Sequence, residues 1–340
     1  MSRVVTFGEI MLRLVPNGYE RFFQSSQMSA TFGGAEANVA VSLANFGVDV
    51  SFVTKVPDNP IGRGAIQNLR GFGVDTKEIV FGGDRLGIYF LEKGISQRAS
   101  VCIYDRNHSA IQQSSPRDFD WDRIFDGAEW FHFTGITPAL GDNLIQICRE
   151  ACHQAKKKGL TISCDLNYRR KLWDTKKAGQ VMSDLCRDVD VCIVNEEDAK
   201  DVFGIKIKHS DIRGAKIDKE EYKEIARQLG ERFDFDKVAV TLRTSYSASI
   251  NHWVGILYDK EQFYTSRDYE LRVIDRVGGG DSFGAGLIYS ILNGKDGQDA
   301  IEFATAASAL KHTIEGDFNR VSVQEVEKLA DGNQSGRVER

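Results

Sequence analysis

The sequence predicts an α/β protein with a mainly parallel, doubly wound sheet, helices on both faces of that sheet and a small β lid. Short apolar runs alternate with helix-length segments along most of the chain, which is the pattern of repeated strand–helix units. The alternation is interrupted by two short alternating runs at 87–92 and 100–106, joined by a turn that contains Gly and Ser. This hairpin pattern predicts a small antiparallel sheet that projects from the parallel one and forms a lid.

The length and composition fit one large domain. The chain has 340 residues, and 41% of them are hydrophobic, which suffices for a sizeable core. We expect a single α/β domain over 1–330, lid segments at about 10–32 and 84–113, and a frayed tail over 331–340. The net charge of −5 argues against a general nucleic-acid or anionic-membrane binder.

Cysteine spacing and the N-terminal segment predict a reduced, cytoplasmic protein. The six cysteines form no C-x-x-C pair and show no metal-ligand spacing. The N-terminal segment lacks the continuous apolar run of a signal peptide, and no apolar run approaches the length of a membrane span.

The first elements carry a glycine pair. Residues 3–15 alternate as a strand does, with Gly8 near the middle as a kink or a close approach to ligand. Gly33 and Gly34 then lead into a helix of small residues. Asn38, one turn inside that helix, is placed to reach back to the glycines and fix a ligand hydroxyl; helix capping and packing explain it equally well.

The rest of the chain supplies further strands at 50–56, 130–135, 160–164, 190–194 and 237–242. His132, inside one of these runs, is predicted to be a core histidine and not a catalyst. In doubly wound sheets ligands bind at the carboxyl ends of the strands, so the residues that follow each strand matter most for function.

Three polar clusters follow predicted strands. The first, at 165–173, contains Asn167 and three adjacent cations, including Arg169, and an arginine fork suits a carboxylate or phosphate. The second, at 195–198, is acidic; a helix start is favoured over a magnesium site. The third, at 241–247, offers hydroxyls for phosphate or ribose, and an ordinary polar loop explains it equally well.

A glycine-rich stretch at 275–286 joins a predicted strand end to an apolar helical run. The backbone N–H groups of Gly278, Gly279 and Gly280, with a helix N-terminus behind them, can hold a phosphate. Asp281 follows directly, where a base for an attacking hydroxyl is needed. The stretch alone is also consistent with a tight turn and a buried helix.

Taken together, Gly33–Gly34 with Asn38 and Gly278–Asp281 resemble the two signatures of the ribokinase-like (PfkB) sugar kinases. The resemblance implies phosphorylation of a sugar hydroxyl, with ATP and Mg²⁺ as cofactors and a monovalent cation as a further candidate. Within the family, the chain is most similar to kinases of a sugar acid, 2-keto-3-deoxygluconate. The stretches that carry this are 8–14, 33–40, 85–90, 104–106, 109–110, 135–139 and 165–173.

The resemblance also implies a role for each matching residue. Asp281 would take the proton from the terminal hydroxyl, and Gly278–Gly280 would form the anion hole. The sugar acid would be held by Gly33, Gly34, Asn38, Tyr89, Tyr104, Arg106 and Arg169, with the two arginines binding its carboxylate. Asn167, Asn195, Thr241 and Arg243 would lie along the nucleotide, and Asp198 would be the magnesium-linked acid. The apolar face of the lid hairpin predicts a dimer or larger homo-oligomer.

The sequence departs from the family pattern at four positions. Asp198 stands where relatives usually carry Glu, and Arg276 where they carry a small residue or proline. Arg243 and Tyr246 stand where glycines are common, so the nucleotide loop should have a different shape. Two alternatives remain: a kinase of a neutral sugar, and a non-catalytic sensor of a sugar acid or nucleotide. Neither the preferred nucleotide nor the gluconate or galactonate epimer follows from the sequence.

Overall fold

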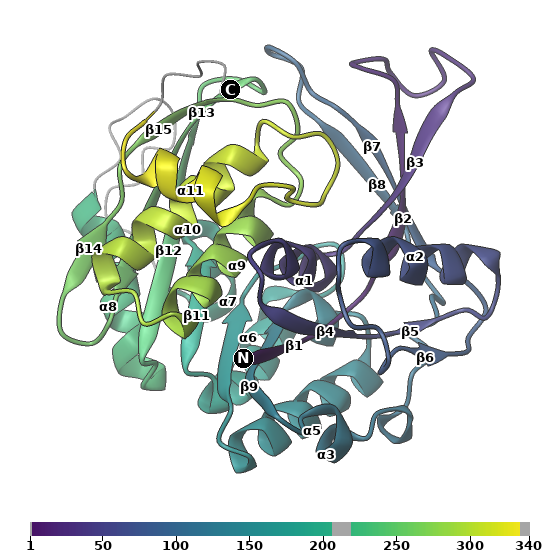
Figure 1. Cartoon of the computed structure of the whole chain (residues 1–340), viewed down its shortest axis with the longest axis horizontal. Helices are drawn as coiled ribbons and strands as arrows, with labels where there is room; N and C mark the ends of the chain where they lie inside the picture. The colour runs from purple at the N-terminus through teal and green to yellow at the C-terminus, as the bar shows by residue number, and fades with distance from the viewer. Residues whose placement is uncertain (1, 206–218, 334–340) are drawn as a thin grey trace.

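The computed structural model describes residues 2–205 and 219–333, and within them nine strands form one large sheet (Figure 1). Its order is β14-β13-β12-β11-β10-β9-β1-β4, with β15 paired to β13. Six neighbouring strands of this sheet run parallel, namely β4, β1, β9, β10, β11 and β12. The strand β13 is antiparallel to its neighbours β12, β14 and β15. The bounds are β1 Arg3–Phe7, β4 Asp49–Val53, β9 Ala128–Thr134, β10 Thr161–Asp165, β11 Val191–Asn195, β12 Lys237–Ser245, β13 Ile250–Tyr258, β14 Phe263–Thr265 and β15 Tyr269–Arg272.

Helices cover both faces of this sheet, which confirms the predicted fold class. One face carries α1 Ala35–Asn45, α2 Pro60–Gly71, α9 Gly279–Leu292, α10 Gly297–Lys311 and α11 Val323–Ala330. The other carries α3 Trp121–Ile124, α4 Ile136–Ala139, α5 Asp142–Lys157, α6 Thr175–Leu185, α7 Glu196–Phe203 and α8 Lys219–Phe233. Short 3-10 turns lie at Pro116–Asp118 and Cys186–Asp188.

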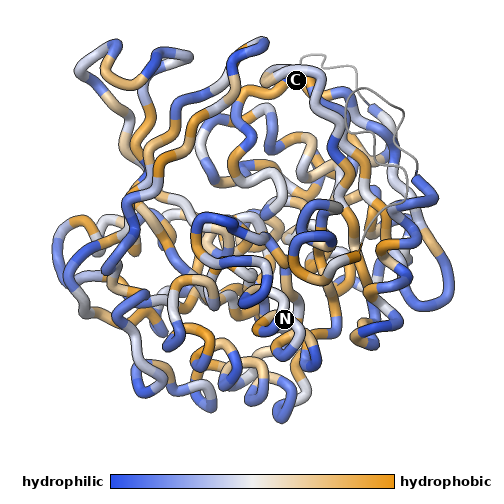
Figure 2. Tube along the Cα trace, turned by 180° about the vertical axis from the view of Figure 1, so that it is seen from behind, coloured by the Kyte–Doolittle hydropathy of each residue, from blue (hydrophilic) through white to orange (hydrophobic). Residues whose placement is uncertain are grey.

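The central strands read as continuous apolar runs because each is buried on both sides. Figure 2 shows this as hydrophobic stretches through the interior and hydrophilic ones at the surface turns. On one face α9 and α10 pack closely through small residues: a Cβ on Gly286 would lie 2.8 Å from the Cα of Ala304. No helix in the described part of the chain is long and apolar enough to cross a membrane.

Two predicted strands are each divided in the structure. The run at 3–15 splits into β1 and β2 (Met11–Pro16), because the chain crosses between two sheets at Gly8. A Cβ on Gly8 would lie 2.0 Å from Glu36 Oε2, so the crossing requires glycine. The run at 50–56 likewise splits into β4 and β5 (Lys55–Val56), which pairs with β6 (Val80–Phe81).

The lid is a separate four-stranded sheet in the order β3-β2-β7-β8, and it projects from the main body (Figure 1). Its remaining strands are β3 Met28–Gly33, β7 Gly87–Glu92 and β8 Val101–Asp105. The predicted β7–β8 hairpin is confirmed. The expected antiparallel sheet is confirmed for β2–β3 and β7–β8 and is wrong for β2 and β7, which run parallel. Ile103 on β8, in the lid hairpin, is an apolar residue that is 51% exposed. The homo-oligomer expected from an apolar face of this hairpin stays a prediction.

The third polar cluster is mostly strand and not loop. The predicted strand at 237–242 continues to Ser245, because β13 folds back along it and supplies hydrogen-bond partners as far as Asn251. Arg243 therefore stands on β12 opposite Trp253, with buried Leu242 pointing to the other face. The predicted tail at 331–340 lies largely outside the described residues.

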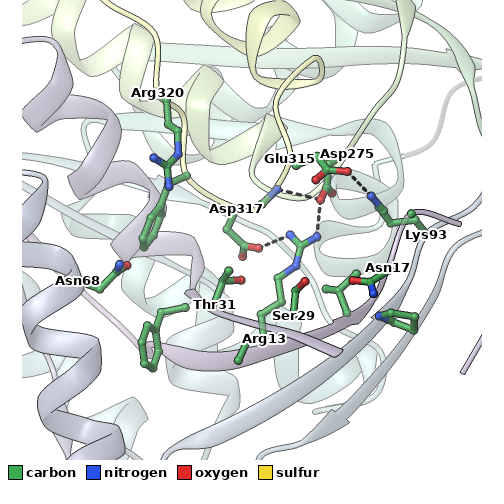
Figure 3. A pocket seen from close by; sticks show the side chains of 17 residues that line it. Arg13, Asn17, Ser29, Thr31, Asn68, Lys93, Asp275, Glu315, Asp317 and Arg320 are labelled. Carbon is green, nitrogen blue, oxygen red and sulfur yellow. Dashed lines mark hydrogen bonds and ion pairs between the residues drawn. The ribbon is translucent and has the colours of Figure 1, made fainter. Parts of the chain in front are cut away.

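A buried ionic network joins the lid to the main body (Figure 3). Arg13 on β2 donates to Asp275 and to Asp317, with 2.6 Å between its Nη1 and the Oδ1 of Asp317. The side chains of all three residues are at most 3% exposed. The Tyr89 hydroxyl of the lid donates to the same oxygen of Asp317. Two lid strands are thus held to two segments near the C-terminal end of the chain.

We predict that Arg13→Met lowers the free energy of unfolding by about 3–5 kcal/mol, because it leaves two buried carboxylates without their cation. Urea denaturation measures this. The control is Arg63→Met, which removes an ion pair to Asp58 whose side chains are 63% and 56% exposed. That variant should lose less than about 1 kcal/mol. Equal losses in the two variants would contradict a central role for the buried network.

Candidate active site

The loop before α9 forms a cradle for an anion. Gly278 caps the helix with φ +84°, and a Cβ there would lie 2.1 Å from the carbonyl oxygen of Asp317, so only glycine fits. Gly280 and Asp281 belong to the first turn, whose N–H groups have no partner inside the helix. A Cβ on Gly280 would meet no atom within 4 Å. The positive end of α9 therefore faces open space that suits a phosphate.

Asp281 stands at the edge of this cradle. Burial raises the pKa of its carboxyl group to about 6, although a hydrogen bond from Asn38 opposes the shift. The Nδ2 of Asn38 lies 2.7 Å from Asp281 Oδ2. The Oδ1 of Asn38 accepts a hydrogen bond from the N–H of Gly34 at 3.3 Å. The expected contact of Asn38 with the first glycine pair is confirmed, and its bond to Asp281 was not foreseen.

Gly33 and Gly34 allow the chain to approach its neighbours closely. A Cβ on Gly34 would lie 1.9 Å from the carbonyl oxygen of Glu9, and one on Gly33 would lie 2.0 Å from Asp317 Oδ2. Asp317 therefore packs against Gly33 through its side chain and against Gly278 through its carbonyl oxygen. Asp317 is the point at which the two glycine signatures meet.

Carboxylates gather at the carboxyl ends of two adjacent strands, close to Asp281. Burial raises the pKa of Asp165, at the end of β10, well above its usual range, and Asp198 and Asp281 raise it further. Burial also raises the pKa of Asp198 to about 7, while Arg169 opposes this shift. Arg169 acts on all three acids. In the residues that the structure describes, no carboxylate lies within ion-pair distance of Arg169.

The other predicted sugar-binding residues lie on the lid. Tyr89 and Tyr104 stand opposite each other on β7 and β8, with 5.9 Å between ring centroids. The Arg106 guanidinium lies 5.3 Å from the Tyr104 ring. Arg106 is also ion-paired with buried Glu9, 2.8 Å separating its Nε from Glu9 Oε2. The charge of Arg106 is thus already balanced, which the sequence did not indicate.

The predicted nucleotide residues line three neighbouring strand ends. Asn195 stands opposite Thr241 across β11 and β12, and Asn167 follows β10 with φ +39°. Asn195 caps α7: its Oδ1 accepts from the N–H of Asp198 at 2.8 Å. The interpretation of this cluster as a helix start is confirmed. Over residues 2–205 and 219–333 no group of three His, Cys, Asp or Glu residues is arranged to bind a metal ion.

Arg243 lies on β12 two residues after Thr241, and Tyr246 directly follows the end of that strand. Burial lowers the pKa of the Arg276 guanidinium, and the charge of the exposed Arg243 lowers it further. Tyr246 is 67% exposed and packs against His252 at 5.3 Å between centroids. His132 is buried, its Nδ1 lies 2.8 Å from Ser163 Oγ, and burial lowers its pKa to about 3, as expected of a core histidine.

Sequence reasoning missed the roles of Arg13, Asp275, Asp317 and Lys311. Asp317 and Lys311 pack against Gly278, and Arg13 forms ion pairs with Asp275 and Asp317. Asp317 follows a glycine after α10 and reads as an ordinary turn. Arg13 and Asp317 also line a cavity of about 370 Å³ between β2, β3 and the segment 315–320 (Figure 3). None of the residues with predicted site roles lines this cavity, so it adjoins the cradle and is not part of it.

Known proteins share this fold. Residues 1–320 match the model of the pfkB family carbohydrate kinases. The chain is 32% identical over 335 residues to a 2-dehydro-3-deoxygalactonokinase of Haloferax volcanii, across 98% of each chain. It is similar to the crystal structure of a 2-dehydro-3-deoxygluconokinase from Thermotoga maritima, with a TM-score of 0.93, 50% identity, and 97% and 98% of the two chains covered. A fructokinase with bound ATP from Xylella fastidiosa has the same fold, with a TM-score of 0.75, 21% identity, and 97% and 98% covered. The two glycine signatures meet at Asp317, and the family match covers residues 1–320. The chain belongs to the pfkB family of carbohydrate kinases.

Proposed function

We propose that this carbohydrate kinase transfers the γ-phosphate of ATP to the terminal hydroxyl of 2-dehydro-3-deoxygluconate, also called 2-keto-3-deoxygluconate. The observation that carries the proposal is the arginine beside the base. Arg169 acts electrostatically on Asp281 and has no carboxylate of its own within ion-pair distance in the described residues. A guanidinium in this position suits the carboxylate of a sugar acid, whereas a neutral sugar would leave it unpaired. The similarity to the Thermotoga maritima protein supports the same substrate.

In the proposed reaction Asp281 accepts the proton of the attacking hydroxyl. The Asn38 amide orients the carboxylate through its 2.7 Å hydrogen bond and leaves the other oxygen of Asp281 for the substrate. The N–H groups of the Gly278–Gly280 loop would receive the charge of the transferred phosphoryl group. The lid residues Tyr89 and Tyr104 would cover the sugar and exclude water.

The nucleotide would lie along the ends of β10, β11 and β12, beside Asn167, Asn195 and Thr241. Two acids there, Asp165 and Asp198, fit the needs of Mg²⁺, which binds proteins through one or two carboxylates and keeps several waters when phosphates supply the remaining ligands. Bound Mg²⁺ would neutralise phosphate charge. The raised pKa of Asp198, about 7, should fall when this cation is present, so metal binding would release protons.

The galactonate epimer is the second candidate, because the Haloferax volcanii relative is named for it. A kinase of a neutral sugar is the third, and the pairing of Arg106 with Glu9 favours it, since one of the two expected cations is already balanced. A sensor would be stabilised by ligands without forming ADP. A panel of both sugar acids, fructose and ribose, scored by kcat/KM in a coupled assay for ADP, distinguishes the two sugar-acid kinases, the neutral-sugar kinase and the sensor.

We predict that Asp281→Asn lowers kcat by roughly 100- to 10,000-fold, because the variant has no base. The same change should raise the melting temperature above pH 7. The folded pKa of about 6 lies above the ordinary 3.8, so stability from this group is lost as the pH rises and the carboxyl ionises. Activity and thermal unfolding of the same sample test both effects. Full activity in the variant would exclude the assigned base.

The pH dependence of the wild-type enzyme should report on the same group. We expect kcat/KM to fall at acid pH with a midpoint near 6, the pKa of Asp281, since the base must be ionised to act. Asn38→Ala removes a donor that favours the carboxylate, so the midpoint should move to higher pH. An unchanged profile in this variant would argue that another group controls the acid limb.

At a pH well above the pKa of Asp281, where the base is ionised in both proteins, Arg169→Met should raise KM for the sugar acid by at least about tenfold and leave activity on neutral sugars nearly unchanged, since the lost interaction is with the carboxylate. The neighbouring Arg170→Met is the matched control, because the Arg170 side chain is 82% exposed and pairs with Asp201. It should change neither value. Equal loss on acid and neutral sugars in the Arg169 variant would remove the carboxylate argument.

A further inference from the structure

One buried cation has no part in the scheme above. Lys311, the last residue of α10, is fully buried, and lysine is rarely so unless its ammonium is paired. Its Nζ donates to the carbonyl oxygen of Ile314 at 3.1 Å. Its Cε lies 3.2 Å from the position that a Cβ on Gly278 would occupy. The side chain therefore lies directly behind the glycine loop.

The groups that face this ammonium are mostly acidic. Burial lowers the pKa of Lys311, whereas Asp275, Asp317 and Asp281 raise it, and Arg13 lowers it. The neighbouring His312 does not add a charge, since burial lowers its pKa to about 4. Arg13 is shared between Asp275 and Asp317, so it can balance only one of these two negative charges. Lys311 is a second cation within electrostatic range of both carboxylates.

We propose that the ammonium of Lys311 is a permanent cation of the phosphate site, which keeps the Gly278–Asp281 loop electropositive and takes the place of a dissolved monovalent cation. The inference rests on the proposed function of that loop. Without Lys311 the surrounding acids would carry an excess negative charge behind the N–H groups that must receive the phosphoryl charge. Lys311 acts through the loop and does not touch the substrate, so it is a positioning residue.

The loop geometry shows how the effect would reach the reaction. The position that a Cβ on Gly278 would occupy lies 2.1 Å from the carbonyl oxygen of Asp317 and 3.2 Å from the Cε of Lys311, so both groups pack against this glycine. The ammonium also lowers the pKa of Asp281, so its loss should make the base harder to ionise. A role confined to packing would require only the volume of the side chain, and an uncharged side chain of similar length would then suffice.

The first experiment needs no variant. The rate of the wild-type enzyme is measured with magnesium and ATP as tetramethylammonium salts, then with added potassium, sodium or ammonium chloride at constant ionic strength. If Lys311 is the resident cation, kcat should change by less than about twofold. An activation of tenfold or more by potassium, absent with tetramethylammonium, would overturn the proposal.

The second experiment removes the charge. Lys311→Met keeps most of the volume, and we expect kcat to fall roughly 10- to 100-fold with little change in KM for the sugar. The midpoint of the acid limb of the pH profile should move to higher pH, because the ammonium favours the ionised form of Asp281. Lys311→Ala should lose as much and be partly restored by methylammonium, which fits the space that is left. The control is Lys55→Met, which removes a lysine of 13% side-chain exposure paired with Asp118, away from the site; its kcat should not change.

The outcomes separate the two proposals. If the wild-type enzyme phosphorylates none of the sugars, the proposed function fails. If it is active and folded Lys311→Met has the same kcat and pH profile, this inference alone is overturned. If neither Lys311 variant folds, the salt experiment on the wild-type enzyme decides. A fall in kcat that methylammonium reverses in Lys311→Ala but not in Lys311→Met supports the role of the charge.

Discussion

The geometry of the active site depends on the buried contact of Arg13 with Asp275 and Asp317. Arg13 comes from a lid strand, Asp275 precedes the glycine loop by three residues, and Asp317 abuts the same loop through its carbonyl oxygen. A buried guanidinium is stable only when its donors are satisfied, so the three segments hold one relative position. The lid, the loop and the start of α9 are thereby fixed to one another.

The same burial gives the site its chemistry. Burial raises the proton affinity of Asp281 and Asn38 limits the rise, so its pKa of about 6 suits a base that works near neutral pH. Such a carboxylate lowers the stability of the folded protein. Large hydrophobic clusters on both faces of the sheet provide the stability that this arrangement requires.

The sequence predicted the parts of the site that are local and missed those that are not. Both glycine signatures, Asn38 and Asp281 stand out because turns and helix starts have short-range patterns. Arg13 contacts residues 262 and 304 positions away, and no local pattern reports such a contact. The ion pair of Arg106 with Glu9, 97 positions apart, was missed for the same reason. The extension of β12 was missed because the partner strand decides where a strand ends.

Asn38 has a consequence for the thermodynamics of binding. One amide side chain contacts the N–H of Gly34, in the turn that we propose to bind the sugar, and the carboxylate of Asp281. A sugar that alters the first bond must alter the second, and so change the proton affinity of the acid. Linkage is reciprocal, so the affinity for sugar then depends on pH, and binding is accompanied by proton uptake or release even before any nucleotide is present.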